Sequence, residues 1–242
     1  LDLQRLALPG TQLKEGLLPA PMISVASGLG NGLNIEGYYQ FGWNKSYLPP
    51  VGSYWNTGYS LGTGNSAFGV HEAKAKNSGQ WGLALKWQPP ESTLNFGAYV
   101  LNYHDKLPQL RVDQTDFSQH WQYLENRKLY GLSVNFPLGD WAIGSELSYR
   151  PKEAVALNPA LTGCALRGGR CWIDTARWQW SVNGIYALNP SNARPLLDFA
   201  KADSGTLLLE LAATRFPHLR REYGGDPISA GYLGWGQQDG AS

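Results

Sequence analysis

The chain has 242 residues, a formal net charge of +1 and only 16% charged residues, compared with roughly 25% in an average soluble domain. Aromatic residues make up 12% of it, including 10 Trp and 13 Tyr, and Gly occurs 29 times. This composition excludes a disordered chain, because disordered chains are poor in aromatic residues and rich in charge. It also argues against a nucleic-acid binder, because no excess of positive charge is available to neutralise phosphates. A β protein is the class that remains.

Neither end of the chain shows a targeting segment. Residues 1–6 lack the basic region, apolar core and cleavage site of a signal peptide. No apolar run approaches the ~20 residues of a membrane-spanning helix. We expect residues 1–242 to form a single β domain, with a strand-rich core at 22–214, and to be a fragment of a longer polypeptide.

Period-two alternation begins with strand candidates at 22–27 and 33–43. Residues 44–78 follow, with Pro49-Pro50 and many Gly, Ser and Asn, and predict a long loop. The clearest strand is 79–87, where the large apolar residues share one face: Trp81, Leu83, Leu85 and Trp87.

A turn at 89–92 and a returning strand at 93–103 complete the first strong hairpin. Both faces of the returning strand are partly apolar, so the sequence alone leaves its orientation open. Residues 104–126 predict a second long loop. A second hairpin runs through the turn at 137–140, with alternation on both sides: Tyr130, Leu132, Val134 and Phe136 before it, and Trp141, Ile143, Leu147 and Tyr149 after it.

Residues 151–176 predict a third long loop, which contains both cysteines of the chain, Cys164 and Cys171. Their spacing is too wide for a redox Cys-x-x-Cys, and two cysteines are too few for a zinc site. We predict a local disulfide, which indicates an oxidising compartment; two free thiols are the alternative. Further strands are expected at 178–186 and 206–214, and no comparable segment has a convincing helical period.

The second face of these strands carries mostly Gly, Ala, Ser, Asn and Gln, where a soluble sandwich normally carries charged residues and Thr. Small polar residues suit the interior of a membrane barrel, and aromatic residues at strand ends suit its two interfacial girdles. The candidate lipid-facing or girdle residues are Trp81, Leu83, Leu85, Trp87, Trp141, Tyr149, Trp178 and Tyr186. The candidate lumen charges are Lys86, Glu146 and Arg150, and the candidate anion contacts in the third loop are Arg167 and Arg170.

Enzyme signatures are missing from the sequence. It has no Gly-x-Ser-x-Gly elbow and no phosphate-binding loop. Its four His residues lack metal-ligand spacing, and we interpret His104-Asp105 as a loop histidine beside an exposed carboxylate. We therefore expect no catalytic residues, no cofactor and no metal.

Several stretches resemble a family of large proteobacterial proteins grouped as domain of unknown function thirteen-zero-two, over about residues 20–215. They are NIEGYYQFGW (34–43), LPPVGSY (48–54), KNSGQWGLALK (76–86), GAYVLNYHDKLP (97–108), ELSYRPK (146–152) and LNP (157–159). The resemblance implies an outer-membrane β-barrel with a signal peptide, longer than this chain, and encoded near an exporter of the RND type. It assigns no functional residue.

We therefore predict an all-β, antiparallel up-and-down meander that forms part of a bacterial outer-membrane β-barrel. Its predicted role is porin-like and non-catalytic: passage or handover of hydrophobic or amphipathic compounds across the cell envelope. The expected partners are outer-membrane lipid or lipopolysaccharide and an envelope transport system, with no nucleic acid. The main alternative is a soluble periplasmic or extracellular β-sandwich that binds a ligand. A weaker alternative is a lipid hydrolase with a barrel fold.

Overall fold

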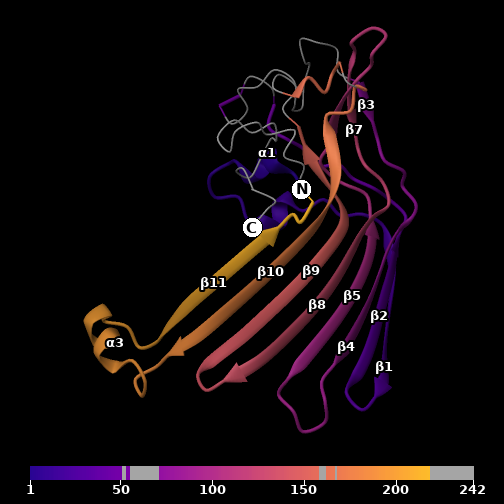
Figure 1. Cartoon of the computed structure of the whole chain (residues 1–242). Helices are drawn as coiled ribbons and strands as arrows, with labels where there is room; N and C mark the ends of the chain where they lie inside the picture. Colours follow the sequence, from indigo (N-terminus) through magenta and orange to yellow (C-terminus); the bar gives the residue numbers. More distant parts are fainter. Residues whose placement is uncertain (51–52, 55–70, 158–161, 167, 219–242) are drawn as a thin grey trace.

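The structure is a computed structural model that describes residues 1–50, 53–54, 71–157, 162–166 and 168–218. In this part of the chain, eight strands form one antiparallel sheet in which each strand pairs with the next sheet strand along the chain (Figure 1). This confirms the predicted all-β meander. The strands, in sheet order, are β1 (Met22–Gly30), β2 (Leu33–Gln40), β4 (Gln80–Trp87), β5 (Asn95–Tyr103), β8 (Arg127–Leu138), β9 (Trp141–Ala156), β10 (Trp172–Leu188) and β11 (Gly205–Arg215).

A second, smaller sheet lies at one end of the large one (Figure 1). It contains β3 (His71–Ala73), β7 (Gln119–Gln122) and β6 (Gln109–Val112), in that order, with β3 parallel to β7. The prediction that 44–78 and 104–126 are loops was therefore wrong in part. These strands have three or four residues, which is too short for alternation to stand out, and β3 pairs with a segment distant in the sequence.

The third predicted loop, 151–176, is also shorter than expected. Strand β9 continues to Ala156 and β10 already begins at Trp172. The pairing of Ala156 with Trp172 extends this ladder past a register shift between Thr175 and Arg177. A bulge of this kind breaks the period-two pattern and hides the extension from a sequence reading.

Three short helical segments lie wholly within the described residues, and the sequence predicted none of them: α1 (Leu3–Leu6), the 3-10 segment η1 (Leu13–Gly16) and α3 (Arg194–Ala200). Each has fewer than eight residues, so none is long enough to display a helical period. Figure 1 shows α3 between β10 and β11, at the end of the large sheet opposite the small sheet. Among the described residues, no helix is long and apolar enough to cross a membrane.

The two ends of the large sheet differ in their connections. At the α3 end, β1 and β2 are joined through Asn31 and Gly32, and β8 and β9 through Gly139 and Asp140. A side chain at Gly32 is excluded, because its φ is +76° and its Cβ would lie 1.7 Å from the Gln88 carbonyl oxygen. The connections at the small-sheet end, 41–79, 104–126 and 157–171, are all long, and we call that end the loop end. At the α3 end only the connection between β10 and β11, 189–204, which contains α3, is of similar length.

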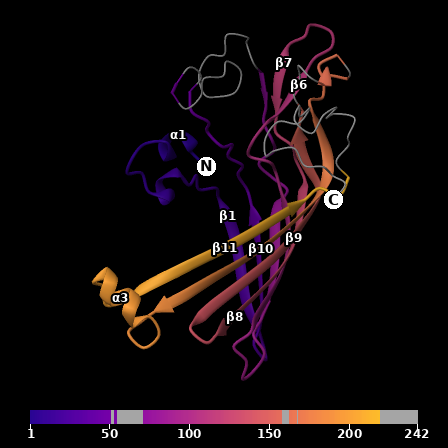
Figure 2. The same ribbon diagram turned by 60° about the vertical axis from the view of Figure 1, so that its left-hand side comes forward.

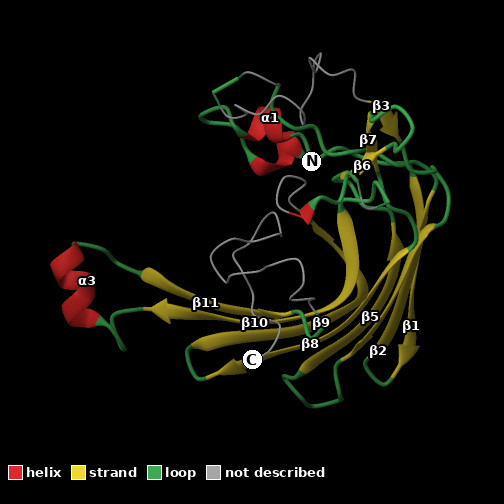
Figure 3. Cartoon of the chain, turned by 45° about the horizontal axis from the view of Figure 1, so that its top comes forward, coloured by secondary structure: helices red, strands yellow, loops and turns green. Residues whose placement is uncertain are grey.

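The large sheet curves into an open arc with β1 and β11 as its two edges (Figure 3), and these two strands do not pair with each other. In Figure 2 the small sheet again lies beyond the loop ends of the strands. The buried apolar clusters also lie at this end: Trp43 contacts Ala75 and Tyr123, and Leu157 contacts the two cysteines. The buried apolar clusters of the described chain therefore lie beyond the loop ends of the large sheet's strands, and not against either face of that sheet.

Candidate functional site

Strand register divides the large sheet into two chemically different faces, because residues paired across antiparallel strands share a face. One continuous row crosses all eight strands: Ser27, Ile35, Leu85, Ala98, Leu132, Leu147, Trp180 and Ala213. We call the face that contains this row the apolar face and the opposite one the polar face. The orientation that the sequence left open for 93–103 is now settled, with Phe96, Ala98 and Val100 on the apolar face.

All eight predicted lipid-facing or girdle residues lie on the apolar face. Their rings pair across strands near both ends of the face. At the α3 end, the ring of Trp141 lies 4.8 Å from that of Tyr186, and at the other end Tyr149 lies 4.4 Å from Trp178. Aromatic pairs therefore border a mainly aliphatic band at both ends, and Trp180 lies within the band.

The apolar face is largely uncovered. Leu132 on the central strand β8 is 58% exposed, and the neighbouring Leu209 and Leu211 on the edge strand β11 are 54% and 70% exposed. Soluble monomeric proteins rarely expose a contiguous apolar patch larger than a few hundred Å², and larger ones mark interaction or membrane surfaces. The described residues therefore leave an extended apolar surface on this face uncovered.

The polar face carries the three predicted lumen charges. Lys86 Nζ lies 2.8 Å from a carboxylate oxygen of Glu36 on the adjacent strand, and both side chains are close to half exposed. Glu146 is exposed and lies opposite Ser133 and Ser181. Arg150 lies at the loop end, with its Nε 3.9 Å from Glu153.

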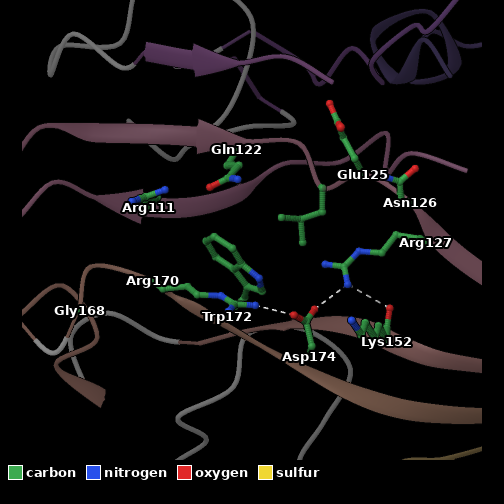
Figure 4. Close-up of a pocket in the computed structure, with 11 residues that line it drawn as sticks. Arg111, Gln122, Glu125, Asn126, Arg127, Lys152, Gly168, Arg170, Trp172 and Asp174 are labelled. Atoms are coloured by element: carbon green, nitrogen blue, oxygen red, sulfur yellow. Dashed lines mark hydrogen bonds and ion pairs between the residues drawn. The ribbon is translucent and has the colours of Figure 1, made fainter. Parts of the chain in front are cut away.

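A denser charged network, centred on Arg127, joins the polar face to the segments of the loop end (Figure 4). The Arg127 side chain is only 7% exposed. Its Nη1 donates to Asp174 Oδ1 at 2.7 Å and to the Lys152 carbonyl at 3.3 Å, and its Nε lies 3.3 Å from Asp105 Oδ2. Arg170 donates to the other Asp174 oxygen. The Asp174 carboxylate of β10 therefore links Arg127 of β8 to Arg170 in the segment before β10.

Burial raises the pKa of Asp105 from 3.8 to about 6, although the Arg127 guanidinium opposes the rise. Since the unfolded carboxyl keeps the lower pKa, the unfolded state loses its proton first as pH increases. The contribution of Asp105 to stability is thus present below about pH 4 and is lost as pH rises to about 6.

We expect Asp105→Asn to remove this pH dependence. Two pKa units correspond to roughly 3 kcal/mol over the full titration, so the stability of the variant relative to the wild type should rise by roughly 2 kcal/mol between pH 4.5 and pH 7.5. Chemical unfolding at both pH values measures the difference. Parallel pH profiles for the two proteins would contradict the assignment.

His104 differs from its predicted role as a loop histidine beside an exposed carboxylate. It is 1% exposed, its Nδ1 accepts a hydrogen bond from the Asn126 N–H, and its Nε2 donates to the Ser78 carbonyl at 2.9 Å. The ring is therefore a structural link between three loop segments. In the described ranges, no group of three His, Cys, Asp or Glu is placed to hold a metal ion.

The predicted disulfide between Cys164 and Cys171 is present, with the two Cα atoms 5.2 Å apart. Both cysteines are buried and contact Leu157. Arg170, next to the bridge, lies with its guanidinium 4.6 Å over the Trp172 ring. Arg167, the other predicted anion contact, lies outside the described residues.

A thiol titration in denaturant should find no reactive thiol before reduction and two after it. Replacing both cysteines by serine should lower the free energy of unfolding by about 2–3 kcal/mol, a modest amount because the bridge closes a short loop. The loss should appear as faster hydrogen exchange in the segments around Leu157 and Trp172. Two reactive thiols in the unreduced protein would contradict the structure.

No local sequence signal groups the central members of the charged network. Arg127, Asp105 and Asp174 are separated by 22 to 69 positions along the chain and meet only because β5, β8, β9 and β10 are adjacent in the sheet. Arg111 reaches the same region through the small sheet. No local motif marks any of these residues, so no sequence signal could have grouped them.

In a comparison with protein-family models, residues 1–241 match the model "Protein of unknown function (DUF1302)". The chain belongs to this family. The family description assigns no activity and no functional residue. Searches of curated proteins and of solved structures found no match.

Proposed function

We propose that this DUF1302 chain is a wall segment of an outer-membrane β-barrel that passes or hands over hydrophobic or amphipathic compounds without covalent chemistry. In this arrangement the apolar face contacts lipid and the polar face borders the interior. The two edges, β1 and β11, are then completed by further strands of the barrel.

One observation carries the proposal: the aliphatic band on the large sheet crosses all eight strands, is exposed, and is bordered by aromatic residues at both ends. A soluble β sandwich buries such a face against a second sheet about 10 Å away. The small sheet lies beyond the loop ends of the strands and does not cover the band (Figure 2). Hydrocarbon is the environment that matches this surface.

The dimensions of the band support the same conclusion. Six residue steps separate Trp81 from Trp87, which is about 20 Å at ~3.3 Å per residue. Transmembrane barrels have an apolar band ~25 Å tall. The long connections at the loop end also follow the barrel plan, as do the short turns at the other end, where the α3 connection between β10 and β11 is the exception.

Heat-modifiable migration in a denaturing gel tests the barrel, with the full-length protein purified in detergent. We expect unboiled protein to migrate differently from boiled protein, and purification to fail without detergent. Conductance or liposome-swelling assays then test passage. A full-length protein that is monomeric in plain buffer would overturn the proposal in favour of a soluble binding module, and turnover of lipid esters would overturn its non-catalytic part.

A further inference from the structure

The pocket at the loop end carries more positive charge than its own carboxylates neutralise. It has a volume of about 500 Å³ and is lined by segments of the small sheet and by the loop ends of β8, β9 and β10 (Figure 4). Four cationic side chains and two acidic ones line it, which leaves an excess of two positive charges: Arg111, Arg127, Lys152 and Arg170 against Glu125 and Asp174.

Both carboxylates are already engaged. Asp174 accepts from Arg127 with one oxygen and from Arg170 with the other. Glu125 lies 3.3 Å from Lys76 Nζ. Within the described ranges, Arg111 has no carboxylate at ion-pair distance. Lys152 likewise has no carboxylate at ion-pair distance in this part of the chain, so Arg111 and Lys152 carry the excess charge and are available to bind an anion.

Arg111 and Arg170 are direct partners in an isolated antiparallel bridge. Residues opposed in this way have Cβ atoms about 4.5–5.5 Å apart, and like charges at such positions destabilise the pair. Both arginines line the pocket. An oxyanion between them would neutralise the repulsion and accept hydrogen bonds from two guanidinium groups, which match phosphate and carboxylate geometry.

The same pocket has an apolar part. Trp172 is 5% exposed and Leu124 is 7% exposed, and both line it. The Trp172 ring stands beside Arg170 in the pocket (Figure 4), and its Nε1 has no hydrogen-bond partner among the described residues. A ligand with only a charged head would leave this part of the pocket unfilled.

We propose that this pocket binds an amphipathic compound, with its phosphate or carboxylate head between Arg111 and Arg170 and the adjoining apolar portion against Trp172 and Leu124. The inference rests on the proposed function, because it names the chemical class of the compound that the barrel would pass or hand over. The binding site is at the loop end, above the polar face.

Isothermal titration of the full-length protein tests the site, with octyl phosphate and octanoate as probes and octyl glucoside as the uncharged probe of equal chain length. We expect both anionic probes to bind, with affinity that falls as salt is raised, and octyl glucoside not to bind. Inorganic phosphate should bind at least tenfold more weakly than octyl phosphate. Arg111→Gln should weaken both anionic probes about tenfold, the effect of losing one charge-assisted hydrogen bond.

Arg194→Gln is the matched control, because Arg194 is 78% exposed on α3 at the opposite end of the sheet; this variant should bind like the wild type. Unchanged binding in Arg111→Gln, or equal binding of octyl glucoside, would overturn the site. Equal binding of inorganic phosphate would overturn its amphipathic class. Binding is measured without a membrane, so a barrel that is heat-modifiable but binds no probe refutes this inference alone.

Discussion

Val182→Arg is expected to lower the free energy of unfolding of the protein in lipid bilayers by about 2–4 kcal/mol, the cost of a cationic side chain on the lipid face near the bilayer midplane. Val182 lies on the apolar face of β10, four residues from each of the two aromatic border residues of its strand, Trp178 and Tyr186. Its substitution therefore places a charge at the centre of the aliphatic band.

The neighbouring position provides a matched control. Asn183 is exposed on the polar face and pairs with Glu210 of β11. Asn183→Arg introduces the same side chain one residue away, opposite a carboxylate, and should change stability by less than about 1 kcal/mol. Denaturant unfolding of full-length protein in phospholipid vesicles measures both values. If the two variants are equally stable, or if Asn183→Arg is the more damaging, the assignment of the faces is wrong.

Arg127→Gln is expected to destabilise the loop end by about 3 kcal/mol, because removing one partner of a buried ion pair leaves the other charges uncompensated. The Arg127 side chain is 7% exposed and its two acidic partners are 23% and 29% exposed. The variant removes the cation shared by Asp105 and Asp174, together with the hydrogen bond to the Lys152 carbonyl.

Arg170→Gln is the control for this network, since Arg170 pairs with the same Asp174 but is 50% exposed. Exposed pairs contribute roughly 0–1 kcal/mol, so this variant should be mildly affected. Hydrogen exchange resolved to the loop end, at pH 7.5, reports both changes. Equal effects of the two substitutions would show that the burial of Arg127 does not determine how much the network contributes to stability.

The sequence was sufficient for the fold class and for the two-faced character of the strands. Period-two alternation in 79–87, 130–136 and 141–149 depends only on the geometry of an extended chain, in which successive side chains point to opposite faces. The same local logic predicted the disulfide from the spacing of Cys164 and Cys171. Local patterns did not predict β3, β6 and β7, because these strands are too short to show alternation. They also did not predict α3, whose seven residues are too few to show a helical period.

Only the tertiary structure decided which distant residues meet. The alignment of Leu85 with Ala98 and Leu132 requires strand register, which a single strand does not encode, and this alignment turns separate patterns into one exposed band. The pocket depends on Arg111 of the small sheet meeting Arg170 of the disulfide loop. Alternation is a property of neighbouring residues, so the sequence determines it by itself. Charge pairing and pocket shape arise from contacts across tens of residues, and the folded chain alone fixes them.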